Sequence, residues 1–247
     1  MKKRGTGAPG HGGTVVPRAI LFDAGGTLVH IDYARVAAVV ERTTDRALPV
    51  SGFVEAEYAG RAAVEAAMAK NGGATDGLRW TIHFAAMLGA LGLSEDEFEM
   101  ASPEIVAEHQ RSNLWSDALA GTAEALASLN RLGLVVGCVS NADGTVDRLL
   151  ERVGLLAHLN FVVDSGKVGI EKPDARIFEI ALGLAGVPAS EAVYVGDIYP
   201  VDVVGARRAG LTPVLLDPLD RYGGRDCRTA RDVPSYCREL VSLLDAA

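Results

Sequence analysis

Short runs of apolar residues alternate with segments of helical periodicity along most of the chain after residue 18. Such runs are typical of strands in a parallel sheet whose two faces are both covered by helices. Repeated strand–helix units connect through right-handed crossovers, so the pattern predicts an α/β fold with a doubly wound, Rossmann-like parallel sheet. The predicted strands are residues 19–22, 134–140, 161–165, 192–197 and 212–217.

Apolar residues spaced three and four positions apart predict the helices between these strands. One helix is expected around residues 146–153, with Asp143 as its capping residue, and another around 178–185. Gly154 and Gly186 stand where these two helices are expected to end. A last helix over residues 236–244 is expected to cover the sheet.

Residues 32–116 interrupt the alternation, because they are rich in Ala, Glu and Arg and lack a convincing strand. Their periodicity predicts four helices, and residues 71–77 form an expected loop. The predicted organisation is a flexible tail (1–17), a core (18–31 and 117–247) and an inserted helical domain (32–116). The predicted helices of the insert are residues 34–46, 54–70, 78–91 and 95–111.

The glycine-rich tail contains a GxGxxG string at residues 5–10. That string binds a dinucleotide only where a strand precedes it and a helix follows it, so that amide groups point at the pyrophosphate. Neither element is predicted here. We therefore expect no dinucleotide site in the tail.

Composition narrows the class of protein further. The 247 residues are 49% hydrophobic and carry a net charge of −8, which excludes global disorder and disfavours nucleic acid as a partner. The longest stretch free of Asp, Glu, Lys and Arg, residues 80–94, is too short to span a membrane. The basic start has no apolar segment behind it, and Cys138, Cys227 and Cys237 form no metal-binding or disulfide pattern. A cytoplasmic protein with reduced thiols is expected.

Polar side chains follow four of the predicted strands. Asp23 follows the first strand, Ser140 ends the second, Lys172 lies in the loop after the third, and Asp197 and Asp202 follow the fourth. Ligands bind beyond the carboxyl ends of the strands in such sheets, so these side chains are expected to converge. Carboxylates suit Mg²⁺, and an ammonium and a hydroxyl suit phosphoryl oxygens.

The motifs at these positions resemble those of the haloacid dehalogenase superfamily of hydrolases. They are Asp23-Ala24-Gly25-Gly26-Thr27-Leu28, Ser140-Asn141, Lys172-Pro173 and Gly196-Asp197 with Asp202. The resemblance covers residues 19 to about 216, and the helical insert stands at the place of that family's type-one cap. Four motifs in the right order are far more specific than any one of them.

The resemblance implies three catalytic residues. Asp23 corresponds to the nucleophile that forms an aspartyl intermediate. Ser140 corresponds to the hydroxyl that holds a transferring oxygen, and Lys172 to the lysine that pairs with the nucleophile and the substrate anion. Lys167 is an alternative to Lys172, but Pro173 matches the family's Lys-Pro pair.

The resemblance also implies a Mg²⁺ site. Its ligands would be Asp23, the backbone carbonyl of Gly25 and Asp197, with Asp202 as a ligand or a support. The residues expected to contact substrate are Gly26, Thr27 and Asn141, although Asn141 also suits a structural hydrogen bond.

Gly25 departs from the pattern, because phosphatases of the family usually carry a second Asp there as general acid and base. Such catalysis contributes roughly 10²–10⁴-fold, so weak activity on alkyl esters is expected. Gly25→Asp is expected to raise that activity unless the residue has a positive φ. His30 and Asp32 are candidate substitutes for the missing acid, and both are also ordinary polar hinge residues.

The leading hypothesis is a Mg²⁺-dependent phosphatase acting on a small phosphorylated metabolite. A metal-independent 2-haloacid dehalogenase and a catalytically weak binding protein are the alternatives. We expect Trp80, Phe84, Met87 and Leu91 to form core of the insert, some of them lining the pocket, and His83, His109 and His158 to be ordinary helix or loop residues. The sequence contains no information on the substrate's identity or the oligomeric state.

Overall fold

The computed structural model describes residues 16–71 and 76–246. The predicted tail, with its GxGxxG string, lies outside the described residues except for Val16 and Pro17, as does the middle of the predicted loop 71–77. No helix in the described ranges is long and apolar enough to cross a membrane. Cys138, Cys227 and Cys237 are all free thiols.

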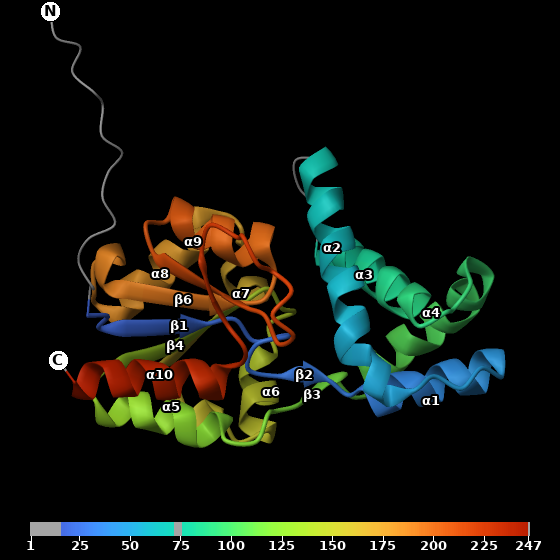
Figure 1. Ribbon diagram of the computed structural model, residues 1–247, viewed down its shortest axis with the longest axis horizontal. Coiled ribbons are helices and arrows are strands. Elements are labelled where there is room, and N and C mark those ends of the chain that lie inside the picture. Colours follow the sequence, from blue (N-terminus) through green and yellow to red (C-terminus); the bar gives the residue numbers. More distant parts are fainter. Residues whose placement is uncertain (1–15, 72–75, 247) are drawn as a thin grey trace, which may run out of the picture.

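A parallel sheet forms the centre of the molecule (Figure 1). Within the described residues it has six strands in the order β5-β4-β1-β6-β7-β8, which confirms the doubly wound fold and all five predicted strands. The sixth, β8, was missed because it is a short edge strand with a polar sequence. The strands are β1 (Ala19–Phe22), β4 (Val135–Ser140), β5 (Phe161–Asp164), β6 (Ala192–Gly196), β7 (Thr212–Leu216) and β8 (Arg228–Ala230).

Helices cover both faces of this sheet, as Figure 1 shows. Apolar residues of α5 (Thr122–Arg131), α6 (Val146–Arg152) and α10 (Val233–Asp245) pack on one face. On the other face lie α7 (Ser165–Val168), α8 (Ala175–Ala185) and α9 (Val204–Arg208). Short 3₁₀ turns at Val50–Gly52, Leu156–His158 and Ala189–Glu191, and a π-helical turn at Tyr199–Val203, complete the connections.

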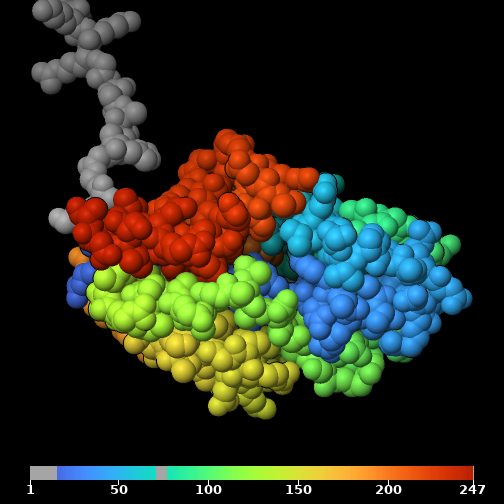
Figure 2. Space-filling view, turned by 60° about the horizontal axis from the view of Figure 1, so that its bottom comes forward, coloured from blue at the N-terminus to red at the C-terminus, as the bar shows by residue number. Residues whose placement is uncertain are grey.

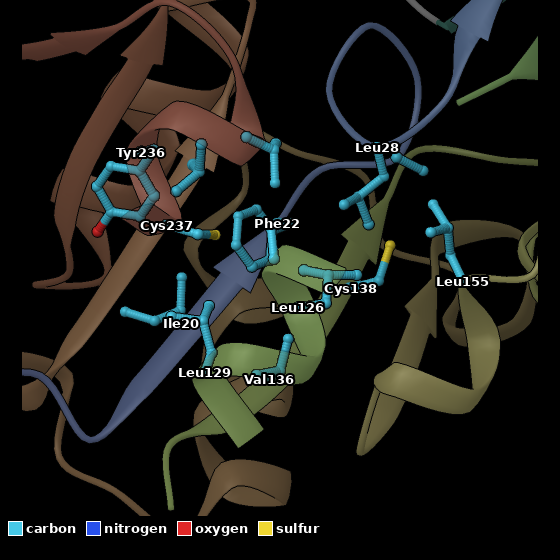
Figure 3. Packing of buried hydrophobic residues seen from close by; sticks show 14 of the residues in the cluster. Ile20, Phe22, Leu28, Leu126, Leu129, Val136, Cys138, Leu155, Tyr236 and Cys237 are labelled. Carbon is cyan, nitrogen blue, oxygen red and sulfur yellow. The ribbon is translucent and has the colours of Figure 1, made fainter. Parts of the chain in front are cut away.

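Strand β1 shows why the apolar runs are continuous rather than alternating. Ile20 and Phe22 pack among residues of α5 and α10, as Figure 3 shows, whereas Ala19 and Leu21 pack toward α8. Successive side chains of a strand point to opposite faces, and both faces are covered here. Every residue of β1 is consequently buried, and the strand delivers Asp23 at its carboxyl end.

The helical insert comprises α1 (Tyr33–Thr44), α2 (Phe53–Asn71), α3 (Asp76–Ala90) and α4 (Glu95–Arg111), so the four predicted helices are confirmed. It has its own apolar cluster, which includes Phe53, Phe84, Met87 and Leu88. In the space-filling view the insert, blue to green, lies directly against the core (Figure 2).

A pair of short antiparallel strands joins the insert to the core. These are β2 (His30–Ile31) and β3 (Trp115–Asp117), and the expectation that residues 32–116 contain no strand was wrong. Both are too short to produce a periodic pattern. Because β3 crosses the expected boundary at residues 116 and 117, the exact division into domains stays a prediction.

The predicted cap of α6 was wrong. Asp143 accepts hydrogen bonds from the backbone and hydroxyl of Thr145 at 3.1 and 2.6 Å, whereas Asp164, distant in sequence, accepts the amide hydrogen of Val146. Gly186 ends α8 with a φ of 65°, as predicted. Gly154, with a φ of 75°, lies just beyond the end of α6.

Candidate active site

A cavity of about 260 Å³ lies between the carboxyl ends of the central strands and the inner face of the insert. The core contributes Asp23, Ser140, Lys172, Asp197 and Asp202 to its lining, so the predicted convergence at one sheet edge is confirmed. The insert contributes mainly aromatic and basic residues. The two sets face each other across the cavity.

The loop after β1 holds Asp23 rigidly. The backbone N–H of Asp23 donates to the carbonyl oxygen of Val195 at 2.9 Å, and the Ala24 N–H donates to Asp23 Oδ1 at 2.7 Å. Gly26 has a φ of 75°, and a Cβ at that position would lie 2.3 Å from Asp197 Oδ2. Glycine is therefore required at Gly26, where the loop passes against a carboxylate of the site.

Lys172 links two carboxylates of the site. Its Nζ lies 2.6 Å from Asp23 Oδ1 and 2.9 Å from Asp202 Oδ1, and it donates to the Tyr194 hydroxyl at 2.8 Å. The side-chain amide of Asn141 holds the backbone of Lys172, accepting its N–H at 2.8 Å and donating to its carbonyl at 3.1 Å. Lys167 instead pairs with Asp147 at the surface.

Tyr194 is a site residue that sequence reasoning missed. It lies in the middle of β6, is fully buried, and donates its hydroxyl hydrogen to the Val139 carbonyl oxygen at 3.0 Å. Its hydroxyl oxygen thereby stays oriented toward Lys172. A tyrosine within an apolar strand carries no pattern that distinguishes this role from simple packing.

Asp197 and Asp202 follow β6, and the π-helical turn folds Asp202 back toward the strand. Asp202 Oδ2 accepts the N–H groups of Asp197 and Ile198 at 3.1 and 2.9 Å. In the described part of the chain, Asp23, Asp197 and Asp202 offer carboxylate oxygens that all lie within 4.8 Å of one another. Asp197 Oδ1 is buried and accepts no hydrogen bond from a described residue.

This donor set fits a hard divalent cation. Three buried carboxylates supply oxygen ligands of the kind that Mg²⁺ prefers, and the unpartnered oxygen of Asp197 is available as one of them. Gly25 lines the same cavity beside Asp23. The backbone carbonyl of a residue can bind a metal ion without a side chain. Gly25 can therefore make the predicted contact with Mg²⁺, although the family usually carries Asp at this position.

Burial and mutual repulsion perturb these carboxylates. Burial raises the pKa of Asp23 to about 8, with Asp202 and Asp197 adding to the effect and Lys172 opposing it. Burial also raises the pKa of Asp197 to about 6, although Arg61 acts in the opposite direction. For Lys172 burial favours the neutral amine, but Asp202 and Asp23 outweigh it and raise the pKa. An added cation would relieve this concentration of negative charge.

The remaining predicted substrate contacts lie at the same edge. Ser140 ends β4, is buried and lines the cavity. Thr27 is also buried, and its Oγ1 has no hydrogen-bond partner among the described residues. The amide of Asn141 is engaged with Lys172, which is the structural role foreseen for it; direct contact of Gly26, Thr27 and Asn141 with substrate stays a prediction.

Arg61, on α2 of the insert, reaches across to the core. Its Nε lies 3.1 Å from Asp197 Oδ2, and its side chain is almost fully buried. Burial disfavours the charged guanidinium, but Asp197 and Glu57 outweigh that effect and raise the pKa of Arg61. The sequence analysis missed this residue, because one arginine in an alanine-rich helix belongs to no motif.

Glu57, one turn before Arg61 on α2, connects several residues of the insert. Its carboxylate accepts from the Tyr33 hydroxyl at 3.0 Å and lies 2.9 Å from His83 Nε2. Burial opposes ionisation, but His83, Arg61 and Tyr33 together lower the pKa of Glu57 to about 2. His83 is therefore more than an ordinary helix residue, since it contacts Glu57 and lines the cavity.

The two candidate substitutes for the missing acid differ in their surroundings. Asp32 caps α1 by accepting the Arg35 N–H at 3.1 Å, which is the hinge role. His30 lines the cavity, and its Nε2 is buried without a partner in the described ranges. Burial, aided by Arg61 and opposed by Glu57, lowers the pKa of His30 and favours the neutral imidazole.

The aromatic residues of the insert divide between core and cavity. Trp80 and Phe84 line the cavity and stack on each other, with ring centroids 4.3 Å apart. Met87 is fully buried and Leu91 packs beside it, as expected of core. His109 lines the cavity and accepts the Leu114 N–H at 3.2 Å, while His158 ends a 3₁₀ turn.

Known proteins resemble this chain over most of its length. The model of haloacid dehalogenase-like hydrolases matches residues 17–210. A phosphoserine phosphatase from Thermus thermophilus is 36% identical over 229 residues, covering 86% of this chain and 88% of that protein. Haloacid dehalogenase-like hydrolase domain-containing protein 3 from Danio rerio is 40% identical over 109 residues, but the match spans only 44% of this chain and 43% of that protein.

Solved structures share the fold at low sequence identity. The HAD hydrolase YfnB from Bacillus subtilis, bound to magnesium, matches with a TM-score of 0.62 at 17% identity and covers 91% of this chain and 99% of its own. The L-2-haloacid dehalogenase from Xanthobacter autotrophicus matches with a TM-score of 0.58 at 20% identity, covering 90% and 98%.

The Rossmann-like sheet, the helical insert and the carboxylate–lysine site at the strand ends together define a capped protein of the α/β class with a candidate catalytic site. The chain belongs to the haloacid dehalogenase-like hydrolase family, whose model matches residues 17–210.

Proposed function

We propose that the protein is a Mg²⁺-dependent phosphatase that hydrolyses a small phosphorylated metabolite through an aspartyl-phosphate intermediate on Asp23. The observation that carries the proposal is the buried contact between Asp23 and Lys172 inside a cluster of three carboxylates. The similarity to the phosphoserine phosphatase supports phosphorus rather than carbon as the site of attack. A cytoplasmic location is part of the same proposal.

The chemistry follows from the placement of Asp23 and Lys172. An oxygen of Asp23 attacks the phosphorus atom, and the bond from phosphorus to the ester oxygen breaks with its electron pair on the leaving group. Water then attacks the same phosphorus atom, releases phosphate and regenerates the Asp23 carboxylate. Lys172 holds Asp23 in position and neutralises charge on the transferring group, and Ser140, which lines the cavity, supplies a hydroxyl hydrogen bond to its oxygens.

Asp23, Asp197, Asp202 and the carbonyl of Gly25 would hold the Mg²⁺ ion. When bound, the ion supplies electrostatic stabilisation of the negatively charged phosphoryl oxygens. Arg61 is suited to bind the phosphate group of the substrate, because its guanidinium reaches from the insert to Asp197 in the carboxylate cluster. A guanidinium in this position binds phosphate oxygens well.

Gly25 restricts the set of substrates. Without a side-chain acid at that position the leaving group departs as an anion, so aryl and acyl phosphates should react far faster than sugar phosphates. The hydrolysis of the aspartyl intermediate should also be slow, because the usual base is absent. A burst of product followed by a slower steady state is the expected time course.

An activity screen tests the proposal directly. Aryl phosphates, acyl phosphates, sugar phosphates and 2-haloacids would be offered with Mg²⁺ and with a chelator. The expected result is turnover of the activated phosphates with Mg²⁺ alone. Release of halide from 2-haloacids in the presence of chelator would overturn the proposal and establish the dehalogenase alternative, which the missing second Asp keeps open.

A further inference from the structure

Trp115 fills the space beside Gly25. A Cβ placed on Gly25 would lie 3.0 Å from the indole Nε1 and 3.2 Å from Cδ1, which is tighter than almost all real contacts of a Cβ. Gly25 does not have a positive φ, so its backbone could accept other residues. The indole, and not the backbone conformation, is therefore what crowds a side chain at this position, which is accepted only if the indole shifts by a few tenths of an ångström.

The position of the indole is well defined. Trp115 lies on β3, opposite Ile31 of β2, and its backbone N–H donates to the side-chain oxygen of Asn113 at 2.9 Å, which fixes the backbone from which the indole projects. The rings of Phe84 and His109 contact it edge-on, with centroids 6.0 and 5.6 Å away. Movement of the indole would therefore disturb its contacts with Phe84 and His109.

Trp115, Phe84 and Trp80 form one continuous surface of the cavity, here called the aromatic wall. It adjoins the loop of Asp23, because Trp115 lies against Gly25, the position at which the family resemblance implies an acid for the leaving group. Flat aromatic groups pack favourably on such surfaces in stacked or edge-to-face arrangements.

Two polar side chains of the lining that could recognise a sugar, Glu57 and Asn141, are already engaged. Glu57 is bound by Tyr33 and His83, and Asn141 by the backbone of Lys172. Four buried nitrogen atoms in the described lining have no hydrogen-bond partner: His30 Nε2, Trp80 Nε1, and Nε and Nη1 of Arg61, the residue assigned above to the phosphate group. The lining thus suits an aromatic leaving group with few polar substituents better than one rich in hydroxyl groups.

We propose that Trp115 takes the place of the missing Asp side chain and selects a planar aromatic leaving group, so that the substrate is an aryl phosphate. This inference rests on the proposed phosphatase function and deepens it. In the reaction the aryl oxygen leaves with the electron pair of the P–O bond and takes its proton from water. The products are a phenol and inorganic phosphate, with one water consumed.

Two substrates whose leaving groups have matched pKa values separate the effect of the leaving group's shape from the effect of its acidity. Phenyl phosphate and a fluorinated alkyl phosphate of similar leaving-group acidity would be compared by kcat/KM. The wild type should prefer the phenyl ester at least ~10-fold, corresponding to about 1.4 kcal/mol of transition-state preference. Trp115→Phe should retain most of this preference, and Trp115→Ala should lose it. Equal rates with the wild type would overturn the aromatic selection.

A double substitution tests whether the indole of Trp115 occupies the space that an Asp side chain at position 25 would need. The sequence alone predicts a gain from Gly25→Asp on an alkyl phosphate; the contact with the indole revises this expectation, so that Gly25→Asp alone should gain much less than the same substitution without the indole. Gly25→Asp combined with Trp115→Ala should gain at least ~10-fold over Trp115→Ala alone, and Gly25→Ala with Trp115→Ala is the matched control. A full gain from Gly25→Asp alone would overturn the proposal.

Binding measurements distinguish failure of this inference from failure of the proposed function. Calorimetry with phenylphosphonate and butylphosphonate needs no turnover and no altered residue. Preferential binding of phenylphosphonate supports the aromatic wall even if every phosphate ester is inert, in which case the phosphatase proposal alone fails. Equal affinity for the two phosphonates contradicts the role of the aromatic wall whatever the activity.

Discussion

The two sides of the cavity are built in different ways. On the core side, Ser140 ends β4, and short loops after β1 and β6 carry Asp23 and Asp197, whose backbone N–H groups donate to the Val195 carbonyl and to the Asp202 carboxylate. On the insert side, functional groups such as Arg61 project from the middle of helices. A strand end fixes the direction of a loop residue, whereas a helical residue reaches the site only if the whole helix is correctly docked.

The difference suggests that the two sides of the cavity have different functions. Residues of the core perform the chemistry, which is common to the family, and residues of the insert contact whatever is attached to the reacting group. Substitutions on the core side should therefore abolish turnover, and substitutions on the insert side should change affinity, preference or stability. Four experiments test this division, in decreasing order of expected effect.

Asp23→Asn should abolish turnover, with a loss on the order of 10³-fold or more, because the amide is not a nucleophile. The fold should remain intact, since an amide of nearly the same size replaces the buried carboxylate. Circular dichroism and steady-state kinetics would measure both, with the exposed Asp220→Asn as a control. Retained turnover in Asp23→Asn would show that another residue is the nucleophile. It would contradict the assignment of the chemistry to the core side of the cavity.

Removal of the metal should also stop the reaction. A chelator should abolish phosphatase turnover and Mg²⁺ should restore it, whereas Asp197→Asn should require at least ~10-fold more Mg²⁺ for half-maximal rate. The measurement is a Mg²⁺ titration of both proteins, with Asp220→Asn again as the control. Full activity in chelator would contradict the magnesium hypothesis.

Arg61→Ala should affect binding more than chemistry. We expect KM for a phosphate ester to rise roughly 10- to 100-fold, the equivalent of one charge-assisted hydrogen bond, with a smaller change in kcat. Arg61→Lys should recover part of the loss. The exposed Arg42→Ala on α1 controls for the loss of a positive charge. A fall in kcat without a change in KM would place Arg61 in the chemistry and remove the distinction between the two sides.

Glu57→Gln should change stability in a pH-dependent manner. Because the pKa of Glu57 is lowered to about 2 from an ordinary value of 4.5, the ionised carboxylate stabilises the folded state above pH 4.5, and this contribution is lost as the pH falls toward 2. At pH 7 the variant should be less stable by roughly 3 kcal/mol at most.

Denaturant unfolding at pH 7 and at about pH 3 would measure the effect on Glu57→Gln. The difference from the wild type should shrink at the lower pH, and the exposed Glu41→Gln should differ little at either pH. A difference independent of pH would mean that Glu57 is only a packing residue and does not organise the insert electrostatically.

Elements with a strong local pattern were predictable from the sequence. The five main strands and the four helices of the insert follow from apolar runs and helical periodicity. The strand pair β2–β3 and the edge strand β8 were not, because so short an element is specified by its partner strand and not by its own residues. Asp143 was a wrong cap for α6 for a similar reason, since the carboxylate that binds Val146 comes from Asp164 on another element.

The catalytic side of the site was likewise encoded locally. Asp23, Ser140, Lys172 and Asp197 stand at strand ends or in the adjoining loops, and the topology of a parallel sheet brings these together without further information. Arg61, Tyr194 and Trp115 depended on the tertiary structure, because the directions in which they point are set by the docking of α2, by the burial of β6 and by the pairing of β2 with β3. The sequence alone thus determined the fold and the convergence of the candidate catalytic groups at one edge of the sheet. Only the folded chain placed an indole against Gly25 and a guanidinium against Asp197, since contacts between distant segments leave no periodic trace in either segment.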